Sequence, residues 1–127
     1  MSHFVTIHTQ IRDVAALRDA CGELGLQVLD NTTARGYATA HTPGEHVIRL
    51  RGPYDIALNR ESKEQPFGLT TDWWNGKVEK EVGKDYGRLL QLYGVHKASR
   101  EARRRGHTVR RARLKDGTIK LSIGGAS

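Results

Sequence analysis

The sequence predicts a single α+β domain: an antiparallel sheet with two helices packed on one face, and a C-terminal β-hairpin. Apolar and polar residues alternate in several short segments, which is the period of half-buried strands. Two longer segments repeat apolar residues at helical spacing, and Asp116-Gly117 separates two alternating segments near the C-terminus. The 127 residues suit one domain, which we expect to span 1–123, with 124–127 as a flexible tail.

The N-terminal third is expected to form a strand, a helix and two weak strands. In residues 3–11 the apolar residues Val5, Ile7 and Ile11 share one parity, which predicts a strand. Asp13 is interpreted as a helix cap. The residues after it form an apolar stripe at helical spacing: Val14, Leu17, Cys21 and Leu24. Cys21 is therefore interpreted as a core residue rather than a nucleophile, and short strands are expected near 26–29 and 35–40.

A long strand is predicted in residues 46–58, with a bend or bulge at Gly52-Pro53. Its apolar residues are even-numbered on both sides of these two residues: Ile48, Leu50, Tyr54, Ile56 and Leu58. A polar loop at 59–66 separates it from a second alternating segment at 67–73. We expect these two strands to pair as a hairpin that lies over the helices.

The second helix is predicted from about Asp85 to Arg105, and Gly106 is expected to end it. Its inward positions are expected to be Leu89, Leu92, Val95, Ala98 and Ala102. Three cations fall on roughly the opposite side: Lys97, Arg100 and Arg104. The outer surface of this helix is therefore expected to be basic.

The C-terminal hairpin is predicted around Asp116-Gly117, because this dipeptide suits the central positions of a type I′ turn. That turn would place Arg113 opposite Lys120 and Arg111 opposite Ser122. Five apolar residues would then face the core: Ala112, Leu114, Ile119, Leu121 and Ile123. The four cations Arg111, Arg113, Lys115 and Lys120 would share the water side.

Positive charge is concentrated near the C-terminus. The formal net charge is +7, and residues 97–120 hold ten Lys and Arg against two acidic residues. Such a local field attracts anionic partners, although the same residues also keep a small protein soluble. The binding hypothesis places an anion-binding or partner-binding face at seven residues: Lys97, Arg100, Arg104, Arg111, Arg113, Lys115 and Lys120.

A second candidate ligand or contact site comprises Tyr54, Asp55, Asp72 and Trp74. Strand pairing would bring Asp55 and Asp72 to the same face, where two carboxylates could perform acid–base chemistry or hold a cation. In the structural alternative, Asp72 caps a loop and neither carboxylate reacts. Trp74 would project outward, which suits a protein contact or base stacking.

Several classes of function lack their motifs. A single cysteine rules out an internal disulfide, and the histidines do not have zinc-site spacing, so no metal site is expected. Phosphate-binding glycine loops, dinucleotide fingerprints and serine nucleophile elbows are absent, so no cofactor and no catalytic residue are assigned. Without a secretory signal or an apolar run of membrane-spanning length, we expect a cytoplasmic protein with no membrane partner.

Four ordered segments resemble one family. They are "MSHFVTIHTQI", "PYDIAL", "TTDWW" and "YGVHKASREARRRGHTVRRARLKDGTIKLSI". The family is named for hypothetical chloroplast reading frame thirty-five and is a domain-of-unknown-function family of cyanobacteria, plastids and other bacteria. Its members usually carry acidic residues before the Asp-Gly turn, where this chain has Arg110, Arg111 and Arg113. They are often encoded near AAA-type ATPases, which implies an accessory role beside such a complex.

Three hypotheses about function remain from the sequence. The first is a non-catalytic binding or accessory protein whose basic C-terminal face docks an anionic partner, such as an acidic protein or an AAA-type ATPase complex. The second is sequence-nonspecific binding of the RNA or DNA phosphate backbone, because residues 97–123 contain no aromatic side chain for base stacking. The third is a small-ligand enzyme that uses Asp55 and Asp72.

Overall fold

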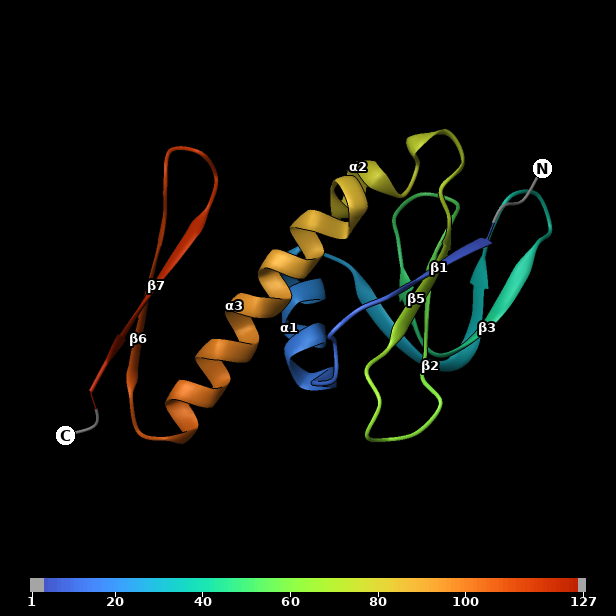
Figure 1. The fold of residues 1–127 in the computed structure, drawn as a ribbon. Helices are drawn as coiled ribbons and strands as arrows, with labels where there is room; N and C mark the ends of the chain where they lie inside the picture. Colours follow the sequence, from blue (N-terminus) through green and yellow to red (C-terminus); the bar gives the residue numbers. More distant parts are fainter. Residues whose placement is uncertain (1–3, 126–127) are drawn as a thin grey trace.

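The computed structural model describes residues 4–125 and confirms a single α+β domain (Figure 1). The elements follow one another as β1 (Phe4–His8), α1 (Val14–Glu23), β2 (Gln27–Arg35), β3 (His41–Arg49), β4 (Ile56–Asn59), β5 (Gly68–Asp72), α2 (Glu79–Val82), α3 (Gly87–Arg104), β6 (Thr108–Arg113) and β7 (Ile119–Gly124). Short 3₁₀ turns occur at Trp74–Gly76 and Lys84–Tyr86. The strand β7 extends one residue into the predicted tail, and residues 126–127 of that tail lie outside the described residues.

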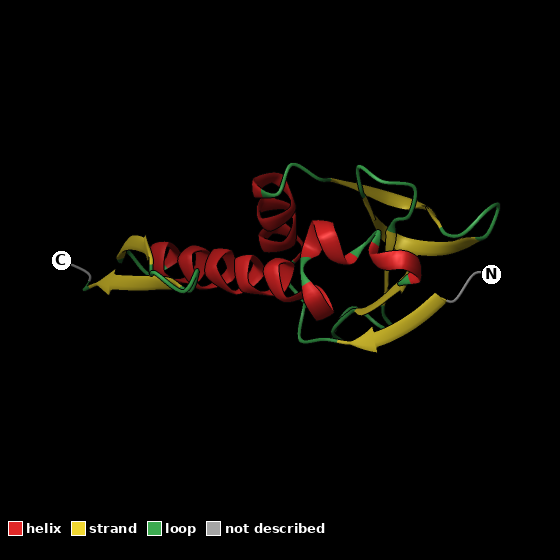
Figure 2. Cartoon of the chain, turned by 90° about the horizontal axis from the view of Figure 1, so that it is seen from above, coloured by secondary structure: helices red, strands yellow, loops and turns green. Residues whose placement is uncertain are grey.

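The first five strands form one antiparallel sheet in the order β1-β5-β4-β3-β2, and β6 and β7 form a separate two-stranded sheet. The main core lies between the large sheet and the helices, and it includes Leu17, Ile56 and Leu89. Figure 1 shows β6 and β7 on the side of α3 that faces away from the large sheet. Figure 2 shows α3 running from the body of the protein out to this hairpin.

The predicted long strand at 46–58 is wrong, because the chain reverses at 50–55 and forms two strands. His46 pairs with Leu58 and Ile48 pairs with Ile56. The connection holds an even number of residues, so the apolar parity continues through it and resembles one bent strand. β5 pairs with β4, so the expected pairing with 67–73 is made only by the second half of the predicted strand 46–58.

The two short strands predicted near 26–29 and 35–40 are also wrong in extent. A single nine-residue strand, β2, covers 27–35 and pairs along its length with β3. Asn31 adopts a left-handed conformation with φ 49°, but pairing continues from Asp30↔His46 to Thr32↔Gly44. A polar, turn-rich sequence therefore bends the strand at Asn31 without ending it.

Both predicted helices are confirmed, with small changes at their ends. Asp13 caps α1 by accepting a hydrogen bond from the Ala16 amide at 3.1 Å. The hydroxyl of Tyr93 on α3 accepts hydrogen bonds from the Arg12 and Asp13 amides, which fixes the start of α1 against α3. Cys21 is fully buried, and burial raises the pKa of its thiol to about 12, so it is a core residue.

The predicted register of the C-terminal hairpin is wrong by one residue. The turn has three residues instead of two, with hydrogen bonds from the Leu114 amide to the Thr118 carbonyl and from the Gly117 amide to the Leu114 carbonyl. Gly117 takes the left-handed conformation, φ 88°, that ends such a turn. As a result Arg113 pairs with Ile119 and Arg111 pairs with Leu121.

This shift separates the cations that were predicted to share one face. Cross-strand partners lie on the same face of a sheet. Arg111 and Arg113 therefore lie on the inner face with Ile119 and Leu121, toward the helices. Lys120 pairs with Ala112 and lies on the outer face.

Candidate functional site

The hairpin arm, residues 108–124, is an exposed element on the outer side of α3. None of its residues is buried. Its contacts to the body include a hydrogen bond of 3.4 Å from the Gln91 side-chain amide to the Gly117 carbonyl. The imidazole of His107 is 2.8 Å from the Gly124 carbonyl and closes the base of the arm. The arm is therefore attached at its inner face and open at its outer face.

Two of the seven predicted binding residues are used inside the fold. Arg111 donates to both carboxylate oxygens of Glu23 on α1, at 2.9 and 2.7 Å. Arg100 on α3 donates to Asp19 on α1 at 2.6 Å. These pairs hold the arm and α3 against α1, so Arg100 and Arg111 do not belong to a free binding face.

The same contacts explain the ionisation of these groups. The hydrogen bond from Arg111 lowers the pKa of Glu23 to about 2, and a hydrogen bond with His96 at 2.8 Å acts in the same direction. The hydrogen bond from Arg100 lowers the pKa of Asp19. In return, the two carboxylates raise the pKa values of Arg100 and Arg111. The two arginine–carboxylate pairs therefore stay charged at neutral pH.

The other eight cations of 97–120 form no ion pair within residues 4–125. They are Lys97, Arg103, Arg104, Arg105, Arg110, Arg113, Lys115 and Lys120. Five of the predicted residues remain in this group: Lys97, Arg104, Arg113, Lys115 and Lys120. Only Glu101 and Asp116 are acidic in this segment, so these eight cations outnumber its acidic residues.

Arg110 is a residue of the outer face that the sequence analysis missed. It pairs with Ser122 and lies diagonally across from Lys120. A shallow hollow of about 270 Å³ lies at this part of the arm and is lined by Ala112, Ser122, Arg111 and both cations. A sequence signal for this register was present: Val109, Arg111 and Arg113 are all odd-numbered. If Val109 faces the helices, both arginines must lie on the same inner face.

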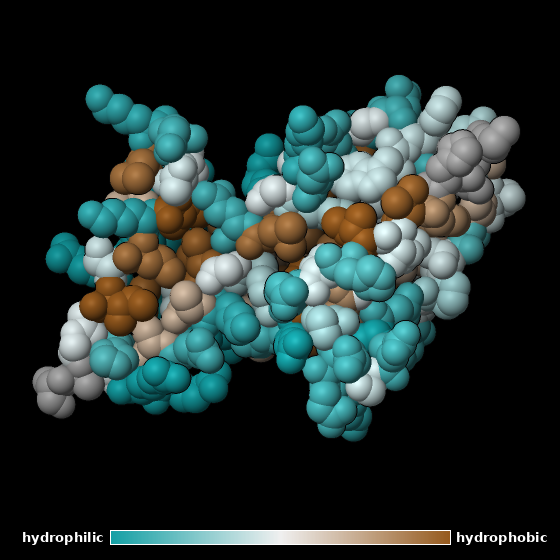
Figure 3. All heavy atoms as spheres, in the orientation of Figure 1, coloured by the Kyte–Doolittle hydropathy of each residue, from teal (hydrophilic) through white to brown (hydrophobic). Residues whose placement is uncertain are grey.

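The arm also exposes apolar side chains. Ile123 is 52% exposed and Leu114 is 45% exposed. Figure 3 shows apolar residues gathered on the arm, with hydrophilic ones above and below them. The arm therefore exposes both cationic and apolar side chains.

Asp55 has a structural position. Its carboxylate is fully buried and accepts two hydrogen bonds of 2.8 Å from the Arg35 guanidinium. It also accepts from the Arg35 amide at 2.9 Å, and Arg49 Nε lies 3.3 Å away. The residue therefore ties the end of β2 to the connection between β3 and β4, and it is not exposed to a ligand.

Asp72 lies next to Asp55 in the register of β4 and β5, but it serves two loops. Its oxygens accept hydrogen bonds from the amides of Tyr37 and Trp74, both at 3.0 Å. Trp74 is 47% exposed and Tyr37 is 40% exposed, and their rings are 6.3 Å apart. Tyr54 is buried. Its burial raises the pKa of its hydroxyl, and the nearby charge of Asp72 acts in the same direction. The predicted second site therefore consists of a buried anchor and an exposed aromatic pair.

The described residues contain no group of three His, Cys, Asp or Glu side chains that could hold a metal ion. Within 4–125 there is also no helix whose length and apolar character would allow it to cross a bilayer.

The fold and surface define a small α+β domain with an exposed, cationic hairpin arm. The chain belongs to the family described as Protein of unknown function (DUF1257), whose model matches residues 20–122. This match confirms the resemblance to a domain-of-unknown-function family. No curated protein and no solved structure matches the chain.

Proposed function

We propose that this chain is a non-catalytic binding protein whose hairpin arm docks an acidic segment of a protein partner. The observation that carries the proposal is the set of eight cations without an internal partner in residues 97–120. On the outer face of the arm, Arg110 and Lys120 flank a shallow hollow that an acidic side chain could enter.

An acidic protein suits this surface better than a nucleic acid. Apolar residues such as Ile123 and Leu114 are exposed beside the cations. Residues 97–123 contain no aromatic side chain, so no base-stacking platform exists on the arm. The family resemblance makes an AAA-type ATPase complex the first partner to test.

The test uses two double variants with the same change in net charge. The first is Arg110→Glu with Lys120→Glu, on the outer face of the arm. The second is Lys63→Glu with Lys80→Glu, at exposed positions outside the arm. Proteins and nucleic acids that copurify with the tagged wild-type chain from its host are isolated, and their affinity for all three chains is measured over a salt series.

We expect the arm variant to bind at least about tenfold more weakly and the control variant to keep wild-type affinity. Equal loss in both variants would reduce the effect to net charge and contradict docking on the arm. If the purified partner is RNA or DNA, with a steep salt dependence and the same loss in the arm variant, the phosphate backbone replaces the acidic protein as ligand.

A further inference from the structure

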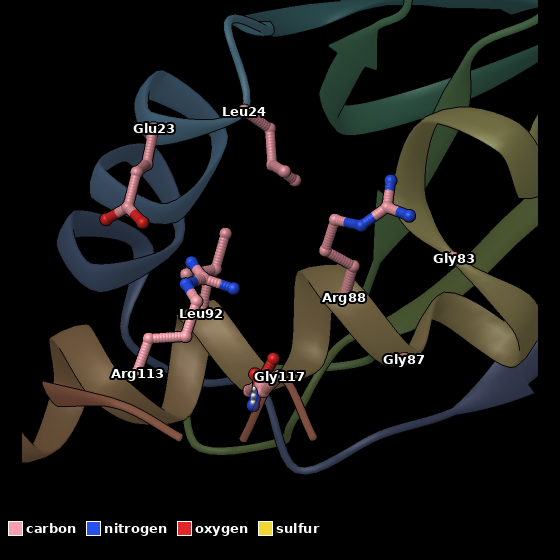
Figure 4. Close-up of a pocket in the computed structure, with 9 residues that line it drawn as sticks. Glu23, Leu24, Gly83, Gly87, Arg88, Leu92, Arg113 and Gly117 are labelled. Carbon is pink, nitrogen blue, oxygen red and sulfur yellow. Dashed lines mark hydrogen bonds between the residues drawn. The ribbon is translucent and has the colours of Figure 1, made fainter. Parts of the chain in front are cut away.

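A second surface lies under the turn of the arm and does not involve its outer face. We call it the tip groove. It is a cavity of about 590 Å³ between the arm, the end of α1 and the first two turns of α3 (Figure 4). The residues that matter for its chemistry are Glu23, Leu24, Arg88, Leu92 and Arg113.

The inner face of β6 carries two arginines with different surroundings. Arg111 meets the carboxylate of Glu23 and is held by two hydrogen bonds. Arg113 lies two residues further along on the same face and lines the tip groove. The guanidinium of Arg113 forms no ion pair and no side-chain hydrogen bond with any residue in the described part of the chain. Arg111 therefore has an anionic partner within the fold, whereas the guanidinium of Arg113 lies at an open hollow.

A second guanidinium lines the same hollow from the helix. Arg88 donates only long hydrogen bonds, 3.4 and 3.5 Å, from Nη1 to the carbonyls of Glu81 and Lys80. Figure 4 shows Arg88 and Arg113 on two sides of the hollow. Glu23 is the one acidic residue lining it, and both Arg111 and His96 already contact its carboxylate. The positive charge facing the groove is therefore not balanced by the residues that line it.

The rest of the lining favours an organic ligand over a bare ion. Leu24 and Leu92 also line the hollow and add apolar surface to it. Gly83 keeps one wall free of a side chain, because its φ is 87° and a Cβ atom would lie 2.8 Å from the Arg88 amide. The volume falls within the range of small-molecule sites, about 300 to 1,000 Å³.

We infer that the tip groove binds a small organic oxyanion, with its phosphate or carboxylate group on Arg113 and Arg88 and its apolar part on Leu24 and Leu92. Guanidinium groups bind both oxyanions through paired N–H donors, which accounts for the shared chemistry.

The test is an NMR titration of the full-length chain with phenyl phosphate and, separately, with benzoate. Benzyl alcohol and inorganic phosphate serve as probes that lack the charge or the ring. We expect phenyl phosphate, benzoate or both to shift the amide resonances of Gly83, Gly87 and Gly117 in a saturable way. The two charged probes show which oxyanion the groove prefers.

Three variants locate the binding. Arg113→Gln and Arg88→Gln should each weaken binding by about tenfold, the value of one charge-assisted hydrogen bond. Arg110→Gln removes the same group from the same strand but on the outer face, and it should leave the affinity unchanged. The amide spectrum of each variant confirms that it is folded.

The inference is overturned if neither charged probe gives a saturable shift at the lining glycines. It is also overturned if benzyl alcohol binds as tightly as phenyl phosphate, or if Arg110→Gln weakens binding as much as Arg113→Gln. These outcomes do not depend on docking of a protein partner, which the Arg110 and Lys120 pair tests separately.

Discussion

Asp55 is the clearest case of a charged residue that the fold itself requires. Its carboxylate is fully removed from water and is bound by the Arg35 guanidinium, the Arg35 amide and the Leu50 amide. A buried carboxylate is tolerated only when such donors replace its hydration. The donors come from Arg35 at the end of β2 and from Leu50 just after β3, so Asp55 holds these two segments together.

We predict that Asp55→Asn lowers the free energy of unfolding by about 3 kcal/mol, because the fully buried carboxylate is lost and the partly exposed Arg35 guanidinium is left without its anion. Urea denaturation measures this loss. The control is Asp30→Asn, which removes a carboxylate that is half exposed and that contacts both Arg18 and His46 at 2.7 Å. Exposed pairs contribute little, so the control should change stability far less. Equal effects of the two variants would contradict the structural role.

Some single residues were predictable because their signal is local. The cap at Asp13 and the burial of Cys21 follow from spacing within one helix. The partners of Asp55 could not be predicted, since Arg35 is twenty residues away and several other cations are as near in sequence. Arg111 meets Glu23 across 88 residues, which no pattern in the chain indicates.

At the level of elements, the C-terminal hairpin shows what alternation can and cannot establish. The Asp116-Gly117 dipeptide correctly located the turn, but the same dipeptide fits turns of two or three residues. The choice between them moves every pair by one position and changes which cations share a face. The candidate site was therefore only partly predictable, although its element was found.

The contact between Arg111 of the arm and Glu23 of α1 should make stability depend on pH. Folding lowers the pKa of Glu23 from 4.5 to about 2, so the folded protein favours the ionised carboxylate. The stabilisation is therefore complete above about pH 4.5 and is lost as the pH falls toward 2. We expect wild type to exceed Glu23→Gln in stability at neutral pH and the difference to disappear in that acidic range.

Urea unfolding of both chains at a series of pH values measures this difference directly. Subtracting the two curves removes the other carboxylates that titrate in the same range, including Asp19, whose pKa is also lowered. The result would contradict the proposed clamp if the difference stayed constant down to pH 2.

Over the whole molecule, stability is distributed unevenly. The five-stranded sheet, α1 and most of α3 share the main buried core. From the arm, only Ile119 packs against that core, and it does so while partly buried. A two-stranded sheet is marginally stable alone, so the arm depends on α3 and on the Arg111 pair with Glu23.

We therefore predict that the arm opens without unfolding of the body. In hydrogen exchange, amides of β6 and β7 should lose protection well before those of β3, β4 and β5, because local opening of the arm exposes little apolar surface. Arg111→Gln should accelerate exchange in the arm and leave the large sheet unchanged. Lys120→Gln, on the outer face of the same hairpin, is the matched control and should change neither. Uniform exchange across both sheets would contradict this prediction, because it would show that the arm and the body unfold as one cooperative unit. The arm would then be a fixed part of the core rather than an element that can reposition on a partner.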